Sequence, residues 1–352
     1  MHSTGLFRAA FSIGLSLVLF AWAGCDSKPS ESASSGSTPA KPSPGEVVIY
    51  SSVDEPDLTP LLKRFEQKTG IKVRAVTDTE ATKTSVLVER IEAEKDHPQA
   101  DVYWGNEIFH TINLAEHGFF DPYRPATAED VPARWRGKGD LYTCIGVRAR
   151  VIAFSTRPEF KDVVSKIHLL RDLGDPTLKD KIGICHPGFG TASGHFAAML
   201  VLWGEPRYVE FMKSLRANNI KLLGGNSAVA DQISAGNLAA GPTDNDDVAD
   251  GKEEKQPIDG VIPDQRDGEP GTLLIPGSIA LMHGASHPAA AKQLIDFLCD
   301  ASIEKELIDA HYLGYSVRAE IPVKAMDVDY VQCAHQMRHA IETALKIIQD
   351  RN

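Results

Sequence analysis

The sequence predicts an α/β protein of two lobes, each a mixed sheet flanked by helices, with two crossing strands as a hinge. Segments typical of strands and helices alternate from residue 46 onward. A long β run at 147–154 interrupts this alternation, and a second alternating set follows it. The span 46–352 can hold two lobes with ordinary cores, because 42% of the residues are hydrophobic.

The first lobe should open with a parallel βαβ unit. Its helix carries Leu58, Leu61 and Phe65 at helical spacing, and Gly70 should end it because glycine readily adopts the left-handed conformation. The expected elements are, in order, a strand at 46–50, this helix, a strand at 71–76, a helix at 84–95, a strand at 100–104 and a helix at 108–117.

The second lobe should follow the crossing strand at 147–154. Its expected strands lie at 181–184, 220–223 and 238–240, and each leads into a loop rich in glycine or aspartate. A return crossing near 261–275 and helices within 287–308 and 333–348 should complete the chain. The expected divisions are 46–146 for the first part of lobe 1, 147–260 for lobe 2 with a hinge strand, and 261–352 for the return crossing, the rest of lobe 1 and the C-terminal helices.

The N-terminus has the pattern of a lipoprotein signal in which Cys25 would carry the lipid. The apolar run at 9–24 is shorter than the roughly 20 residues that span a bilayer, so we expect a cleaved signal peptide at 1–24. Residues 25–45 are rich in serine, proline and glycine and should form a disordered tether. The protein would then be lipid-anchored, in the periplasm or on the outer face of the cell membrane.

Composition and motif content narrow the function classes. The net charge is −11, so we expect no nucleic-acid partner, because such binders need a basic face. No CxxC, HExxH or GxSxG motif occurs, which removes the commonest redox, zinc and serine-hydrolase signatures. Four further cysteines permit three disulfide pairings or free thiols, and the sequence does not choose among them: Cys144, Cys185, Cys299 and Cys333.

Loops at the carboxyl ends of the predicted strands are the candidate ligand site, because open α/β sheets bind ligands at that edge. Free backbone N–H groups and helix dipoles meet there and favour anions. Thr191, Ser193, Asn226 and Ser227 lie in two such loops and could bind a ligand. The glycines at 188–194 would equally serve a tight strand-to-helix turn without any ligand.

Six segments occur in an order and spacing that are typical of a known family. They are YSSVD at 50–54, FEQKTGI at 65–71, ADV at 100–102, LAEHGF at 114–119, GGNSA at 224–228 and GTLLIP at 271–276. Together they resemble the ferric-iron class of periplasmic solute-binding proteins of ABC importers, over about residues 46–315. The resemblance implies the type II periplasmic binding fold, closure over a small ligand and delivery to an ABC permease in the inner membrane. We also expect a monomer, and we expect no enzymatic activity because the sequence shows no catalytic constellation.

The metal-ligand positions of that class hold other residues here. Its best-known ferric binders use a His, a Glu and two adjacent Tyr, and the positions that align without gaps hold Asp54, Asn106 and Asn245-Asp246. Aspartates are hard oxygen ligands too, so Asp54, Asp244 and Asp246 could hold Fe(III), calcium, another hard cation or an organic ammonium. Residues 243–247 would equally form a solvated acidic turn. Ser51 and Ser52, in the loop of Asp54, are further candidate ligand residues.

We therefore expect a binding protein for import whose cargo is Fe(III) with a synergistic anion, and no other cofactor. Like charges in a closing cleft repel, so Asp244 and Asp246 should demand a cargo with positive charge. The alternative cargo is a small organic or phosphorylated solute, such as an aminophosphonate or a sugar phosphate, with its anion at the two glycine-rich loops. An extracytoplasmic enzyme that uses Asp244 and Asp246 as a carboxylate pair is the remaining alternative.

Overall fold

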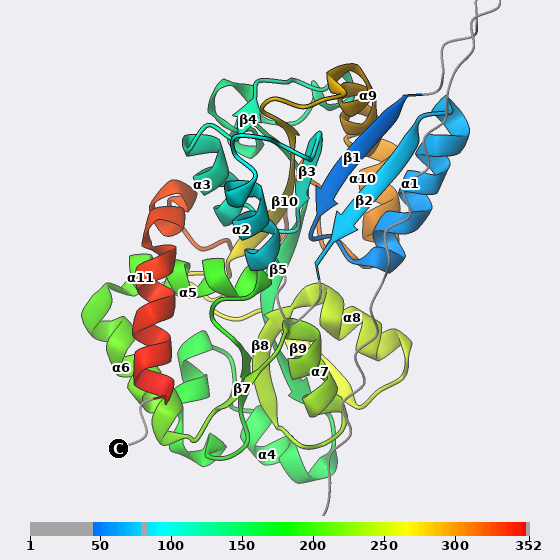
Figure 1. Cartoon of the computed structure of the whole chain (residues 1–352). Coiled ribbons are helices and arrows are strands. Elements are labelled where there is room, and N and C mark those ends of the chain that lie inside the picture. The colour runs from blue at the N-terminus through cyan, green and yellow to red at the C-terminus, as the bar shows by residue number, and fades with distance from the viewer. Residues whose placement is uncertain (1–44, 79–83, 350–352) are drawn as a thin grey trace, which may run out of the picture. The chain divides into compact units, whose positions relative to one another are not determined.

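The computed structural model describes residues 45–78 and 84–349 (Figure 1). The predicted signal peptide, the lipidation site at Cys25 and nearly all of the predicted tether lie outside these residues. In the part of the chain that is described, no helix combines the length and apolar character that crossing a membrane requires.

The first lobe opens with the expected parallel βαβ unit. Strands β1 (Glu46–Ser51), β2 (Lys72–Thr77) and β3 (Val102–Gly105) pair in parallel in the order β2-β1-β3. Helix α1 (Glu55–Thr69) ends at Gly70, which has a φ of 75° and is left-handed as predicted. The other elements of this part are α2 (Ser85–Ala93), α3 (Phe109–Glu116) and the short strand β4 (Phe120–Asp121).

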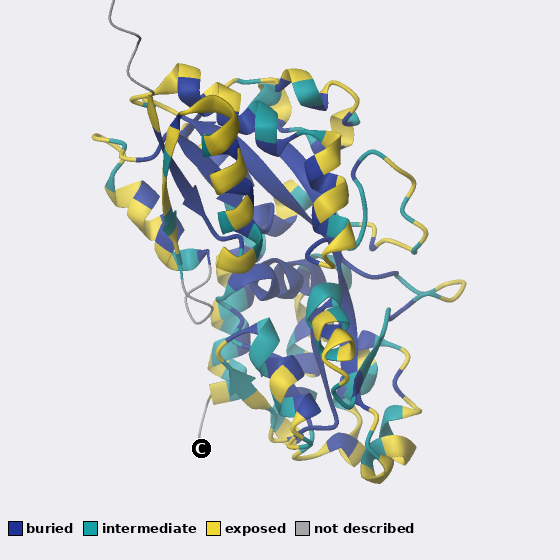
Figure 2. Ribbon diagram, turned by 90° about the vertical axis from the view of Figure 1, so that its right-hand side faces the viewer, coloured by how far each residue is buried: buried dark blue, intermediate teal, exposed yellow. Residues whose placement is uncertain are grey.

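Strand β10 (Leu274–Met282) completes this sheet from far along the chain. It lies between β3 and β5 (Thr143–Ser155), pairs antiparallel with both, and also pairs with β4. The sheet is therefore mixed, and Figure 2 shows its buried strands behind helices whose outer faces are exposed.

Strand β5 is the predicted crossing strand and is longer than the expected run at 147–154. Its first half pairs with β10, and its second half pairs antiparallel with β8 (Ala240–Asp244) and β9 (Ile258–Val261). Every residue of β5 except Phe154 is buried. The arginines at 148 and 150 therefore sit inside the protein where the two lobes meet.

The second lobe follows the predicted alternation. Its strands β6 (Gly183–Cys185) and β7 (Lys221–Leu223) pair in parallel. Its helices are α4 (Lys161–Val164), α5 (Gly190–Trp203), α6 (Glu205–Ala217), α7 (Asn226–Ser234) and α8 (Asn245–Glu253). Short 3-10 helices lie at Ala126–Ala128, Ala133–Trp135, Lys138–Asp140, Pro158–Phe160, Leu170–Gly174 and Pro176–Leu178.

The last helices are α9 (Pro288–Leu298), α10 (Ala301–Asp309) and α11 (Tyr330–Gln349). Figure 1 shows α11 beside α5, and α11 packs against α5 and α6 of the second lobe and α3 of the first. The four cysteines of the described chain are buried, and none of the three possible disulfide pairings forms among them.

The acidic stretch 243–247 is not the solvated turn that we considered. Thr243 and Asp244 end the buried strand β8, with exposures of 0% and 1%, and Asn245 begins helix α8. Asp244 and Asp247 form a capping box at the start of that helix, so part of the acidic stretch has a local structural role.

Candidate ligand cleft

A cavity of about 430 Å³ lies where loops of both lobes face β5. Seven of the residues predicted for ligand or metal binding line it: Asp54, Asn106, Thr191, Asn226, Ser227, Asp244 and Asp246. They come together because each lies at or after the carboxyl end of a strand, which is the edge that α/β sheets use for ligands.

Three predicted residues do not line the cavity. The Ser51 hydroxyl donates to the carbonyl of Trp104 at 3.1 Å, and Ser52 donates to Asn106 Oδ1 at 3.1 Å and accepts from its backbone N–H at 2.9 Å. Ser52 thus positions Asn106 instead of contacting a ligand itself. Ser193 is fully buried on α5, and its hydroxyl makes no hydrogen bond within the described residues.

Two helix N-termini open onto the cavity. Helix α5 follows Phe189 and helix α7 follows Gly225, and in the described structure neither N-cap residue satisfies the helix with a side-chain hydrogen bond. An uncapped helix leaves the backbone N–H groups of its first turn for another acceptor, and its dipole favours negative charge there. At the α8 N-terminus, in contrast, Asp247 Oδ2 accepts a hydrogen bond from the Asp244 backbone N–H at 3.2 Å.

Arg150, on β5, links elements of the cavity wall through its hydrogen bonds. Its Nη1 donates to Asp244 Oδ1 at 2.7 Å, to Thr191 Oγ1 at 3.1 Å and to Asn226 Oδ1 at 3.1 Å. These partners belong to β8, α5 and α7, so one buried guanidinium fixes the relative positions of three elements. Arg150 also donates through Nε to His195 Nδ1 at 3.2 Å, and burial together with Arg150 holds the pKa of His195 well below its ordinary value. His195 is therefore neutral and accepts this hydrogen bond.

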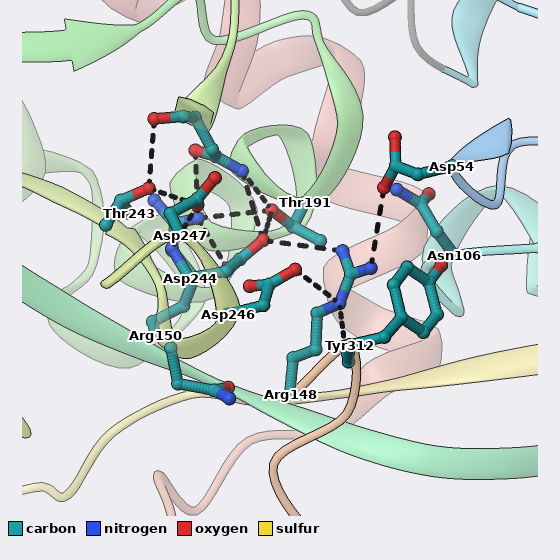
Figure 3. Close-up of polar contacts among 12 residues, drawn as sticks. Asp54, Asn106, Arg148, Arg150, Thr191, Thr243, Asp244, Asp246, Asp247 and Tyr312 are labelled. Atoms are coloured by element: carbon teal, nitrogen blue, oxygen red, sulfur yellow. Dashed lines mark hydrogen bonds and ion pairs between the residues drawn. The ribbon is translucent and has the colours of Figure 1, made fainter. Parts of the chain in front are cut away.

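Arg148 lies two residues earlier on β5, on the same face of the strand, and contacts carboxylates of both lobes (Figure 3). Its Nε is 3.1 Å from Asp246 Oδ2, its Nη1 is 3.9 Å from Asp244 Oδ2, and its Nη2 is 3.9 Å from Asp54 Oδ2. Burial alone would lower the pKa of Arg148, but these carboxylates raise it well above its ordinary value. The guanidinium is thus a permanent positive charge in the cavity wall.

Tyr312 fixes the orientation of this guanidinium. Arg148 Nε donates to the Tyr312 carbonyl at 3.1 Å, and the Arg148 Cζ lies 4.2 Å from the centre of the Tyr312 ring. A cation over an aromatic face is attracted to it, and a stacked arginine loses little further freedom when it binds a ligand.

The two arginines compensate the negative charge of aspartates in the cleft. We expected Asp244 and Asp246 to lack compensation and to require a cationic cargo. Arg150 and Arg148 instead pair with them at 2.7 and 3.1 Å, so these carboxylates do not by themselves demand a cation. One carboxylate oxygen each of Asp244, Asp246 and Asp247 still lies within 4.8 Å of the others, which is a spacing that a metal ion could use.

Other acidic residues of the cavity were not predicted. Asp57 and Asp250 also line it, and burial, followed by the charges of Glu253 and Glu254, raises the pKa of Asp250.

The prediction from sequence also missed Arg148, Arg150 and Tyr312. The available signal was the pair of arginines at alternate positions of a run read as a buried strand, since arginines are rarely buried without partners.

The fold and this cleft define a solute-binding protein of two lobes. Residues 47–312 match the family model of the bacterial extracellular solute-binding proteins, and the chain belongs to that family. It is a family of binding proteins and not of enzymes. An uncharacterized protein of Haemophilus influenzae is 27% identical over 269 residues, which cover 75% of this chain and 74% of that protein.

Solved structures confirm the type II fold that the sequence predicted. The ferric binding protein from Campylobacter jejuni has a TM-score of 0.75 and 21% identity, over 86% of this chain and 99% of that one. AfuA from Actinobacillus pleuropneumoniae, solved with exogenous fructose-6-phosphate bound, has a TM-score of 0.75 and 24% identity, over 87% of this chain and 99% of that one. Iron-bound HitA from Pseudomonas aeruginosa has a TM-score of 0.75 and 20% identity, over 86% and 99%. At these identities the similarity carries the fold and not the ligand.

Proposed function

We propose that the protein is the substrate-binding component of an ABC importer and that its cargo is a small phosphorylated or phosphonate-bearing organic solute. The observation that carries this proposal is the meeting of the uncapped α5 and α7 N-termini with Arg148 at one cavity. Backbone N–H groups, aligned dipoles and a fixed guanidinium are the donors that bind phosphate oxygens in proteins.

The acidic side of the same cavity would receive the rest of the solute. Asp54 and Asp57 come from the first lobe, and Asp250 comes from α8 of the second. Carboxylates of this kind accept hydrogen bonds from sugar hydroxyls or pair with an amine. A sugar phosphate or an aminophosphonate presents both chemistries. The fructose-6-phosphate complex of AfuA, which has the same fold, is in keeping with a cargo of this size and class.

Fe(III) remains the second candidate cargo. Asp244, Asp246 and Asp247 supply hard oxygen ligands at close spacing, and several proteins of the same fold are ferric binders. The arginines argue against it, because Arg148 Nε already lies 3.1 Å from Asp246 and Arg150 Nη1 lies 2.7 Å from Asp244. A cation placed among these carboxylates would be repelled by both guanidinium groups.

Thermal shift and calorimetry with the purified protein test the choice of cargo. Fructose-6-phosphate, 2-aminoethylphosphonate and ferric citrate are added in parallel, and the protein from its own host is analysed for metal by native mass spectrometry. We expect stabilisation by a phosphorylated or phosphonate compound and no retained iron. Stoichiometric iron, with no response to either organic compound, would reverse the order of the two candidates.

We further propose that the protein is anchored by lipid on Cys25 and acts as a monomer in the periplasm or on the outer face of the membrane. The sequence of residues 1–24 and the tether at 25–45 support this placement. Cys25→Ser should release the protein or leave an uncleaved precursor. Recovery of a cleaved, lipid-bearing Cys25→Ser protein from membranes would contradict the anchor.

A further inference from the structure

Arg148 combines three properties that no other part of the described cleft wall shares. It is 3% exposed, it belongs to the crossing strand β5, and it faces Asp54 of the first lobe as well as Asp244 and Asp246 of the second. Asp54, Asp244 and Asp246 are thus arranged around a positive charge that is part of the chain (Figure 3).

The geometry points to Arg148 as the residue that sets the charge selectivity of the cleft: it takes the place of a metal cation among the aspartates and binds an oxyanion of the cargo. The oxyanion half rests on the proposed function, whereas the exclusion of metal ions does not.

The proposal that Arg148 binds an oxyanion follows from the hydrogen bonds of its guanidinium group. Arg148 Nη2 is buried and makes no hydrogen bond to any described residue. Its distance of 3.9 Å from Asp54 Oδ2 is too long for a hydrogen bond, although the charges still attract. A buried donor without an acceptor costs about 1–3 kcal/mol, and an oxygen of the cargo would remove that cost.

The exclusion of metal ions follows from charge and position. Nε of Arg148 occupies one side of Asp246, and Nη1 faces the same Asp244 oxygen that accepts from Thr191 and Asn226. Tyr312 holds the guanidinium in this place through its carbonyl and its ring. The arginine cannot lose its proton in a protein, so a cation entering this cluster meets a fixed like charge.

Arg148→Met tests both halves, with terbium(III) as the cation probe and inorganic phosphate as the anion probe. Tyr312 lines the cavity, so terbium bound there should luminesce when tyrosine is excited. We expect wild-type protein to give little Tyr312-dependent signal and Arg148→Met to gain it, with terbium affinity at least tenfold higher. The Arg148→Met Tyr312→Phe double variant should lose that gain, which separates the cleft from surface carboxylates. Phosphate affinity should fall at least tenfold in Arg148→Met.

Arg148→Lys keeps the charge and tests the geometry if the methionine variant does not fold. Lysine supplies a point charge without the planar fork, so the Arg148→Lys protein should still exclude terbium but bind phosphate several-fold more weakly. Arg136→Met is the matched control: its side chain is 16% exposed and lies 3.7 Å from Asp140, outside the cavity, so both probes should behave as in wild type.

The proposal is overturned by a folded Arg148→Met protein that gains no Tyr312-dependent terbium signal, or by an Arg148→Lys protein that binds phosphate as tightly as wild type. Failure of the proposed function has a different signature. In that case neither fructose-6-phosphate nor 2-aminoethylphosphonate stabilises the wild-type protein, while the terbium comparison between wild type and Arg148→Met still reports on Arg148 alone.

Discussion

Arg150 and Asp244 form a buried ion pair in which Nη1 of the arginine lies 2.7 Å from Oδ1 of the aspartate and both side chains are 2% exposed. The pair joins the crossing strand β5 to the last residue of β8. Removing one partner of such a pair leaves the other charge buried without compensation, which typically costs about 3–5 kcal/mol.

We therefore expect Arg150→Met to lower the free energy of unfolding by about 3–5 kcal/mol, measured by urea denaturation. The comparison is Arg64→Met, which removes an ion pair of 2.7 Å to Glu306 whose two side chains are each 44% exposed. Exposed pairs contribute about 0.2–1 kcal/mol, so equal losses in the two variants would contradict a structural role for Arg150.

Gly194 should not tolerate alanine. A Cβ at this position of α5 would overlap the ring of Phe109, the first residue of α3 in the other lobe. Alanine usually favours a helix, but forcing a methyl group into a packed contact costs about 1–3 kcal/mol. We expect Gly194→Ala to lower the melting temperature, measured by differential scanning calorimetry.

Gly224→Ala is the control for that substitution. No atom lies within 4 Å of a Cβ built at Gly224, in the loop before α7. Alanine there should change stability by less than about 1 kcal/mol, and a gain is the more natural sign because alanine restricts the unfolded chain. An equal loss of stability in both glycine variants would show that the contact with Phe109 is not the cause.

Asp264 should make the protein less stable as the pH rises. The residue is 6% exposed, and burial raises the pKa of its carboxyl from 3.8 to about 6. Between these two values the folded protein binds more protons than the unfolded chain, so the free energy of unfolding falls with rising pH. Asp264→Asn removes this titration, and asparagine also suits the φ of 61° at this position.

We expect Asp264→Asn to raise the free energy of unfolding at neutral pH by about 1–3 kcal/mol and to have little effect near pH 4. Denaturant titrations across this range measure the difference. Asp259→Asn provides the opposite sign: its burial is outweighed by hydrogen bonds from Lys252 and the Gly260 backbone, which lower the pKa of Asp259. The Asp259→Asn protein should lose stability at neutral pH. A gain of stability in both variants would contradict the raised pKa of Asp264 as the cause.

The four internal cysteines should be unreactive thiols. Burial raises the pKa of Cys144, Cys299 and Cys333, the last to about 12, so little reactive thiolate forms at neutral pH. A Cys25→Ser protein should react slowly with a thiol reagent when native and give four thiols in denaturant without reductant. A count of two or none in denaturant would reveal disulfides that the structure lacks.

Local patterns were enough to predict the first βαβ unit. The apolar spacing of Leu58, Leu61 and Phe65 and the stop at Gly70 depend only on neighbours in sequence, and α1 ends where that pattern says it should. The position of β10 was beyond such reasoning. Its partners β3 and β5 are remote in the chain, and strand pairing depends on the three-dimensional arrangement of the whole sheet.

The sequence predicted the acidic and amide residues of the candidate site but not its arginines. Asp54, Asn106, Thr191 and Asn226 follow strands, and the edge rule for α/β sheets brings such residues together. Arg148 lies inside a strand, where sequence gives a face but not the groups opposite that face. The conclusion that the aspartates need a cationic cargo failed for this reason.

The position of β10 in the sheet also determines when the first lobe can fold. This strand, which begins at Leu274, separates β3 from β5, so the first lobe cannot complete its sheet until most of the chain has been synthesised. Contacts between remote segments also make folding slow, because loop closure must precede the pairing. The first lobe therefore gains its complete sheet only after the segment Leu274–Met282 has been made and has paired with β3 and β5.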